Sequence, residues 1–309
     1  MGLNHRISPQ NIQQLENENY PLKNVMFEII KKTRIAPDTF RFEISAPLTA
    51  EKFQAGQFII LRPLATSERI PLTVMQADKK KGTITLIVKA VGFTTWQLAG
   101  LNKGDQIADL LGPLGHPSNI AHFGTVVVIG GGVGAAVSFA VAEALKNAGN
   151  RIVSILGARN REFMILEDEF REVSDEIFIM TDDGSYGRKG FVSDQLKELY
   201  AQGRRFDRLI AAGPIPMMKV ISEITRQFNT PTIVSLNPIM VDGIGMCGGC
   251  RAIVGGKIVF VCVDGPEFDA HQVDFDSLSR RNSAYQDIEA LKAHKCRIDM
   301  QLEAEKNNE

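Results

Sequence analysis

The sequence lacks the features that distinguish membrane, secreted and nucleic-acid-binding proteins. It has no excess of charge of one sign, because 35 Lys and Arg residues face 36 Asp and Glu residues, whereas nucleic acids and membrane surfaces attract a positive excess. The longest apolar stretch, residues 125–145, is interrupted by glycines and by Glu143 and does not suit a membrane span. The first 20 residues are polar and do not resemble a secretion signal. We therefore expect a soluble, cytoplasmic protein that binds neither nucleic acid nor membrane.

Cysteine is scarce, and the first two thirds of the chain contain none. In a reducing cytoplasm, a group of nearby thiols suits metal binding better than disulfide formation. The last third of the chain is therefore where we expect a metal centre. The four cysteines are Cys247, Cys250, Cys262 and Cys296.

The first part of the chain predicts a small antiparallel barrel. A length of 309 residues indicates about two domains, with three small ones possible. After a polar tail at residues 1–22, residues 23–120 carry short alternating or β-branched runs separated by Pro and Gly, a pattern typical of antiparallel β-structure. The expected strands include residues 40–44, 57–62 and 83–88.

Residues 121–232 predict a doubly wound parallel sheet. The run at residues 125–129 is continuously apolar, as expected of a strand buried on both faces. Strands and helices then alternate, which is typical of a doubly wound fold. The further strands are expected at residues 152–156, 176–181 and 208–213, and the helices at residues 135–148, 163–173, 192–202 and 216–227.

Residues 233–309 predict a small cysteine-containing module. A Gly- and Cys-rich loop follows the strand at residues 232–236, and a further strand is expected at residues 257–262. A charged amphipathic tail from Asp287 to about Lys306 predicts a terminal helix. The overall prediction is an α/β protein with a β-barrel, a doubly wound domain and a small C-terminal module.

A glycine-rich turn follows the first strand of the doubly wound domain. Gly130, Gly132 and Gly134 stand between the strand and its helix, where backbone N–H groups and a helix N-terminus can face a pyrophosphate. A tight turn without a ligand is the alternative. Gly213 and Pro214 strengthen the nucleotide hypothesis, because ligands bind at the carboxyl ends of such strands.

Two carboxylates follow the third strand of the same domain. Asp182 and Asp183 are expected at the same edge of the sheet as the glycines. Asp-Gly sequences also form ordinary solvated turns. Both interpretations, a nucleotide contact and a surface turn, remain open at this point.

The cysteine loop carries the spacing of an iron–sulfur site. Cys247 and Cys250 form a Cys-x-x-Cys pair, and Cys262 follows twelve residues later. Plant-type [2Fe–2S] loops have the spacing C-x₄-C-x₂-C with a distant fourth ligand. Here the position of the first ligand is occupied by Asp242, and a carboxylate is an unusual ligand for a soft cluster.

Other interpretations of the cysteines remain. A structural zinc site needs four ligands, and Asp242 or Cys296 would complete one. A thioredoxin-like redox pair is expected near a strand-to-helix turn and suits this Gly-rich loop less well. Cys296 lies apart from the other cysteines on the predicted terminal helix, so we expect it to be a plain cysteine.

The predicted barrel carries a third group of polar residues. Arg69 and Thr73 enclose the segment Ile70-Pro71-Leu72, and Gly92-Phe-Thr-Thr95 opens a helical segment. An Arg together with a helix N-terminus forms a phosphate site. A surface Arg and an ordinary Thr cap are the alternative.

Together, these three groups resemble the ferredoxin–NADP reductase superfamily over about residues 23–275. Within it, the match is to the electron-transfer subunit of type B dihydroorotate dehydrogenase and its relatives, the sulfide dehydrogenase subunit and the small subunit of NADH-dependent reduced ferredoxin:NADP oxidoreductase. The resemblance implies FAD in the barrel, NAD(H) on the doubly wound domain (NADP(H) being possible) and a [2Fe–2S] cluster in the module. The implied cluster ligands are Asp242, Cys247, Cys250 and Cys262.

The resemblance also assigns residues to FAD. It places Arg69 at the pyrophosphate, Thr73 near the flavin N5 and Gly92, Thr94 and Thr95 in a second phosphate loop. The superfamily has a stacking Tyr where this chain has Leu72. In the cluster loop, the ferredoxin:NADP oxidoreductase branch has Asp where the dihydroorotate branch has Cys, so Asp242 favours the former branch.

The implied function is electron transfer between NAD(H) and a partner, with no catalytic acid or base. The resemblance predicts a second flavoprotein of the glutamate-synthase small-subunit type, or ferredoxin, as that partner. Residues 157–162 after the second strand carry charges of both signs and lean weakly towards NADP, whereas the resemblance favours NADH, which we adopt. The alternatives are a stand-alone NAD(P)H flavin reductase with structural zinc, a non-enzymatic nucleotide-sensing subunit and a dihydroorotate dehydrogenase subunit.

Overall fold

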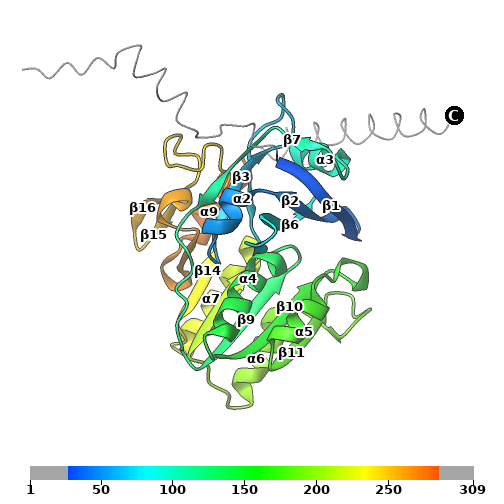
Figure 1. The fold of residues 1–309 in the computed structure, drawn as a ribbon. Helices are drawn as coiled ribbons and strands as arrows, with labels where there is room; N and C mark the ends of the chain where they lie inside the picture. The colour runs from blue at the N-terminus through cyan, green and yellow to red at the C-terminus, as the bar shows by residue number, and fades with distance from the viewer. Residues whose placement is uncertain (1–26, 285–309) are drawn as a thin grey trace, which may run out of the picture.

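The computed structural model describes residues 27–284 (Figure 1). The predicted tail at residues 1–22, the predicted terminal helix from Asp287 and Cys296 lie outside these residues. Among the described helices, none is long and apolar enough to cross a bilayer.

The N-terminal region is an antiparallel barrel built from two sheets around one core, which confirms that part of the predicted fold. The first sheet has the order β5-β6-β2-β1-β7 and the second β4-β3-β8, with every pair antiparallel. Fully buried side chains such as Phe42, Ile59 and Leu86 fill the space between them. The elements are β1 (Phe27–Ala36), β2 (Thr39–Ser45), α2 (Pro47–Lys52), β3 (Phe58–Arg62), β4 (Ile70–Thr73), β5 (Gln76–Asp78), β6 (Thr83–Lys89), α3 (Phe93–Gly100), β7 (Gln106–Ile107) and β8 (Asp109–Leu114).

The second region is a doubly wound sheet of order β12-β11-β10-β9-β13-β14-β17, as predicted. Its strands are parallel except for β17, which pairs antiparallel with β14. The strands are β9 (Thr125–Gly131), β10 (Arg151–Ala158), β11 (Glu176–Thr181), β12 (Arg188–Lys189), β13 (Arg208–Ala212), β14 (Thr232–Ser235) and β17 (Glu267–Asp269).

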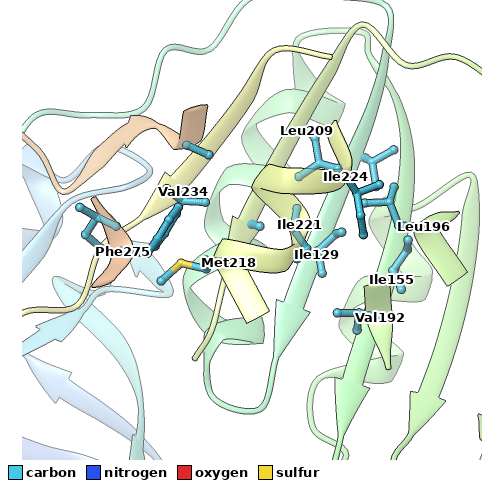
Figure 2. Close-up of a cluster of buried hydrophobic side chains, with 14 of the residues drawn as sticks. Ile129, Ile155, Val192, Leu196, Leu209, Met218, Ile221, Ile224, Val234 and Phe275 are labelled. Atoms are coloured by element: carbon cyan, nitrogen blue, oxygen red, sulfur yellow. The ribbon is translucent and has the colours of Figure 1, made fainter. Parts of the chain in front are cut away.

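Helices cover both faces of this sheet. Along β9, Val127 and Ile129 enter one core while Val126 and Val128 enter the other, because successive side chains point to opposite faces. Figure 2 shows the first core, where Ile129 and Val234 of the sheet lie close to Met218 and Ile221 of a covering helix. Helices α4 (Gly134–Asn147) and α5 (Glu167–Val173) pack on one face, and α6 (Val192–Ala201), α7 (Ile215–Gln227) and α9 (Phe275–Asn282) on the other.

The cysteine module lies against both larger regions. Figure 1 shows its hairpin of β15 (Arg251–Val254) and β16 (Lys257–Phe260), in orange, beside the barrel and above the sheet. The module is less separate than the sequence predicted, because its strand β17 becomes the edge of the doubly wound sheet. This pairing fixes the segment after Cys262 to the doubly wound sheet.

Two predicted elements are corrected. The helix expected at residues 163–173 begins only at Glu167, because Leu166 has a left-handed φ of 60° that a helix cannot continue. The strand expected at residues 257–262 ends at Phe260, and Cys262 lies instead in the helical turn α8 (Val261–Asp264). The side chain of Asp264 accepts the N–H of Phe260 at 2.7 Å, which links the two ends of that turn.

Close packing of α4 on the sheet generates the first prediction. A Cβ at Gly134 would lie 2.2 Å from the carbonyl oxygen of Ala212, so Gly134→Ala must push α4 away from β13. We expect the free energy of unfolding to fall by about 1–3 kcal/mol, measured by urea denaturation.

Gly92→Ala is the matched control, because a Cβ at Gly92 meets nothing within 4 Å; we expect it to cost less than about 1 kcal/mol. Equal destabilisation by both substitutions would contradict the packing argument.

Candidate functional site: two nucleotide sites and a cysteine loop

A cavity of about 510 Å³ lies at the carboxyl ends of β9, β10, β11 and β13. This is the position at which doubly wound folds bind dinucleotides, since the strand order reverses direction between β9 and β13. Of the predicted residues, Gly132, Asp182 and Pro214 line it. The cavity volume is in the range of a small-molecule site.

The glycines of the turn divide into two roles. Gly132 has φ of +55°, and a Cβ there would meet nothing within 4 Å, so its backbone is open to the cavity. A Cβ at Gly130 would lie 2.7 Å from the Cα of Ala135, and Gly134 lies against Ala212. Gly130 and Gly134 therefore allow the helix to approach the strands, and Gly132 is the one of the three that lines the cavity.

The remaining predicted nucleotide residues, Asp183 and Gly213, do not line the cavity. The side chain of Asp183 accepts the N–H of Ser185 at 2.8 Å, and this hydrogen bond lowers the pKa of the Asp183 carboxyl. Asp183 thus forms a surface turn, the alternative to a nucleotide contact, whereas Asp182 lines the cavity. A Cβ at Gly213 would lie 3.2 Å from the Cα of Gly131, so Gly213 allows the ends of β9 and β13 to meet.

The barrel supplies cavity residues that the sequence analysis missed. Thr39 and Lys89, paired across β2 and β6, line the cavity together with Arg159 and Phe163. The Lys89 ammonium lies 5.3 Å and the Arg159 guanidinium 5.6 Å from the centroid of the Phe163 ring. No local pattern marks Thr39 or Lys89, because they reach the cavity only through the packing of barrel on sheet.

The predicted FAD residues lie along one edge of the barrel. Arg69 is exposed directly before β4, and Pro71, Leu72 and Thr73 are half-buried within it. Ser67 donates a hydrogen bond to the side chain of Gln97 in α3 at 2.8 Å. This bond brings the Arg69 segment beside the helix that Gly92 opens.

The N-terminus of α3 is shaped by a threonine. The Oγ1 of Thr95 accepts the N–H groups of Val91 and Gly92, each at 2.9 Å. Thr94 is buried, whereas the space around Gly92 is open. Thr95 thus serves as a capping residue, and Gly92 leaves the helix N-terminus accessible to a phosphate.

The four predicted metal ligands form two pairs. The sulfur atoms of Cys250 and Cys262 lie 3.2 Å apart in a buried position. Asp242 and the exposed Cys247 form the other pair, because the Asp242 carboxylate accepts the N–H of Cys247 at 2.6 Å. Backbone N–H groups also point at sulfur, from Gly249 to Cys247 at 3.4 Å and from Cys262 to Cys250 at 3.5 Å.

The ionisation of these groups follows from their surroundings. Burial, followed by the neighbouring Cys250 sulfur, raises the pKa of Cys262 to about 12. Burial also acts to raise the pKa of Asp242, but hydrogen bonds from the N–H groups of Ile244 and Cys247 outweigh it and lower that pKa. Asp242 is therefore anionic at neutral pH, and the Cys262 thiol is neutral unless a metal displaces its proton.

The donor set fits a two-iron cluster better than one zinc ion. Within residues 27–284, no three His, Cys, Asp or Glu side chains converge as a single metal ion requires. Two pairs of ligands, one on each iron, need no such convergence. The thiolates and the N–H groups that point at them suit an iron–sulfur cluster.

Exposed apolar side chains surround this loop. We call Val241, Ile244, Met246 and Val263 the apolar collar; each is adjacent in sequence, or within two residues, to one of the four ligands. Met246, next to Cys247, is 81% exposed. Exposed apolar groups gathered around one site indicate a contact surface for another protein.

Comparison with known proteins agrees with this arrangement. An oxidoreductase FAD-binding domain matches residues 26–118, and an oxidoreductase NAD-binding domain matches residues 128–223. The iron–sulfur cluster binding domain of dihydroorotate dehydrogenase B matches residues 237–274. The three matches coincide with the barrel, the doubly wound sheet and the cysteine module.

Whole-chain relatives give the same result. A dihydroorotate dehydrogenase B electron transfer subunit homolog of Thermotoga maritima is 47% identical over 85% of this chain and 93% of its own. The electron transfer subunit of that enzyme from Geobacillus thermodenitrificans is 35% identical over 79% of this chain and 96% of its own. A chain in the solved structure of an NADH-dependent reduced ferredoxin-NADP oxidoreductase is 46% identical, with a TM-score of 0.83 over 87% of this chain and 97% of that one.

FAD, NAD(H) and an iron–sulfur cluster are thus the cofactors that the three domains bind. The chain belongs to the family of dihydroorotate dehydrogenase B electron-transfer subunits and is an oxidoreductase of the ferredoxin–NADP reductase fold.

Proposed function

We propose that this chain passes electrons between NAD(H) and a partner protein, through FAD in the barrel and a [2Fe–2S] cluster in the cysteine module. The observation that carries the proposal is the pairing of Asp242 with Cys247 and of Cys250 with Cys262. This arrangement provides two ligands for each of two irons. It lies in the same chain as a dinucleotide cavity and an FAD-binding domain.

We assign the cofactors to the following residues. Gly132, Asp182 and Pro214 contact NAD(H) directly, and Gly130, Gly134, Asp183 and Gly213 shape the surrounding backbone. FAD is held along the edge formed by β4 and the start of α3. The residues for FAD are Arg69, Pro71, Leu72, Thr73, Gly92, Thr94 and Thr95, and those for the cluster are Asp242, Cys247, Cys250 and Cys262.

Bound FAD exchanges two electrons with nicotinamide and single electrons with an iron–sulfur cluster. The residues of this chain supply position and electrostatics for that exchange. Gly132 and the N-terminus of α4 bind phosphate, while Thr39 and Lys89 of the barrel close the cavity on the side of the flavin. Arg69 is exposed and free to turn towards the FAD pyrophosphate.

Among the family's branches, we favour the ferredoxin:NADP oxidoreductase type over the dihydroorotate type. Asp242 stands where the latter has a cysteine, and its pairing with Cys247 supports a carboxylate ligand. The solved relative of this type matches 87% of this chain with a TM-score of 0.83. We therefore infer that the partner is a second flavoprotein of the glutamate-synthase small-subunit type, and that ferredoxin is the alternative acceptor.

The apolar collar supports a protein contact at the cluster, because an electron that leaves the cluster for a partner protein needs a short path across the interface.

Thiol ligands of this kind remain reduced in a reducing compartment. This supports a cytoplasmic location.

The cluster ligands give the second prediction. Cys247→Ser removes the iron–sulfur absorption and electron-paramagnetic-resonance signal from anaerobically purified protein and leaves the flavin, because the cluster loses a thiolate while the barrel is unchanged. Asp242→Cys retains a cluster with an altered resonance signal, because a thiolate replaces an oxygen ligand.

Iron and acid-labile sulfide content provide the check on both variants. If the wild-type protein contained neither iron nor acid-labile sulfide, the structural-zinc interpretation would replace the cluster interpretation. An unchanged resonance signal in Asp242→Cys would show that Asp242 is not a cluster ligand.

The third prediction concerns the nicotinamide. The Arg159 and Arg161 guanidinium groups lie over the rings of Phe163 and Tyr186, so a 2′-phosphate would compete with these ring contacts for either group. We expect kcat/KM for dye reduction to be about tenfold higher with NADH than with NADPH.

Arg159→Leu raises the KM for NADH, because Arg159 lines the cavity. Arg161→Leu is the matched control and leaves the KM for NADH unchanged. A clear preference for NADPH would reverse this assignment.

The fourth prediction tests the partner surface. Met246→Glu places a charge in the apolar collar, and we expect it to weaken binding of the partner flavoprotein by about tenfold while the cluster spectrum is retained. Leu48→Glu on α2 is the control, since Leu48 is also exposed but lies on the barrel. Calorimetric titration measures both. Equal loss of binding in the two variants, or in neither, would place the interface elsewhere.

A further inference from the structure

A short segment after β8 joins the barrel to the stretch that follows Cys262. The N–H of His116 donates to the carbonyl oxygen of Gly265 at 2.7 Å, and the N–H of Ser118 donates to the carbonyl oxygen of Ala55 at 2.8 Å. Gly115 lies close enough that a Cβ there would be 3.0 Å from the Gly265 oxygen. Residues 115–118 are therefore in contact with the barrel on one side and with the cysteine module on the other. We call this contact the seam.

A side-chain hydrogen bond joins residues 115–118 to β17 of the cysteine module. The Oγ of Ser118 donates to Oε1 of Glu267 at 2.7 Å, and Ser118 is buried. A Cβ at Gly56, where φ is +87°, would lie 2.1 Å from this Oγ, so glycine at this position leaves the space that the hydroxyl occupies. Glu267 is itself fixed, because it pairs with Ser235 in the sheet.

Burial of the Glu267 carboxylate is unfavourable, and neighbouring groups offset part of that free-energy cost. Burial raises the pKa of Glu267, whereas the Ser118 hydrogen bond and the positive charge of Arg208 favour its ionised form. The Arg208 guanidinium lies 3.9 Å from the centroid of the Phe123 ring, and its buried Nε has no hydrogen-bond partner among the described residues. Loss of the Ser118 hydroxyl would leave the carboxyl with less compensation for its burial.

The position of the seam couples it to the cluster ligand. Only residues 263–266 separate Cys262 from Glu267. Within that stretch, Gly265 is bonded to His116, and the carbonyl oxygen of Pro266 accepts the N–H of Leu236 at 2.9 Å. A shift of β17 relative to the barrel therefore moves Cys262 relative to the FAD edge.

We propose that Glu267, through Ser118, is a positioning residue that sets the distance between the FAD site of the barrel and the cluster ligand Cys262. This inference rests on the proposed function. Electron transfer between two centres slows steeply as they separate, whereas the NAD(H) cavity is lined by none of the described seam residues. Loosening the seam therefore slows transfer from flavin to cluster and leaves reduction of the flavin by NADH unchanged.

The test mixes NADH rapidly with protein that holds FAD and its cluster, and follows the flavin by absorbance and the cluster by freeze-quench resonance. Glu267→Ala and Ser118→Ala slow cluster reduction by about tenfold and change flavin reduction by less than about twofold. Glu267→Gln keeps an acceptor for Ser118 and stays within about twofold of wild type in both steps. Ser222→Ala is the control, because its Oγ bonds Ala270 at 2.9 Å on the side of the module that faces α7.

Hydrogen exchange gives a readout independent of activity. In Glu267→Ala and Ser118→Ala, but not in Ser222→Ala or Glu267→Gln, the amides of residues 115–118 and 263–267 exchange faster. If Glu267→Ala fails to fold, Ser118→Ala carries the comparison.

Cluster reduction at the wild-type rate in Ser118→Ala, or equal slowing of flavin and cluster, would overturn the proposal. A wild-type protein whose flavin is reduced while its cluster stays oxidised contradicts the proposed function instead, and the exchange rates then still decide whether Glu267 holds the seam.

Discussion

One hydrophobic core holds the parts of this protein in a fixed arrangement. Phe58 and Ile60 of the barrel strand β3 share it with Val234 of the doubly wound sheet and with Cys250 and Cys262 of the cysteine module. The loop that carries Asp242 is equally close, since a Cβ at Gly243 would lie 2.5 Å from the Ile60 side chain. Because these side chains pack at the density of a protein interior, the three cofactor sites cannot move independently. Electron transfer within one chain depends on this constraint.

The contact between barrel and sheet adds a second constraint. Arg41 of β2 forms an ion pair with Glu169 of α5, and the side chain of Gln76 donates to Glu143 of α4 at 3.3 Å. These partly exposed contacts contribute little free energy individually. They orient the barrel so that Thr39 and Lys89 complete the dinucleotide cavity. The cavity is therefore lined by residues of both the barrel and the doubly wound sheet.

The sequence predicted the architecture because burial leaves a strong pattern in long elements. The apolar run at residues 125–129 and the helix after it are recognisable locally, and the cysteine spacing follows from ligand chemistry. The three-residue strand β17 was missed because so short a segment has no periodicity and exists only by pairing with β14. Thr39 and Lys89 were missed for a related reason, since tertiary packing alone brings them to the cavity. The glycine turn lies between β9 and α4 as predicted, but only the structure separates Gly132, which lines the cavity, from Gly130 and Gly134, which serve helix packing.

In the proposed function, electrons from NADH reach a cluster held by the cysteine module of the same chain. An anaerobic titration of the purified protein with NADH, followed by flavin absorbance and by electron paramagnetic resonance, tests it most directly. We expect substoichiometric NADH to bleach the flavin and to produce the resonance of a reduced [2Fe–2S] cluster in the same samples. A flavin fully bleached by excess NADH, beside a cluster that only a stronger chemical reductant reduces, would contradict the account.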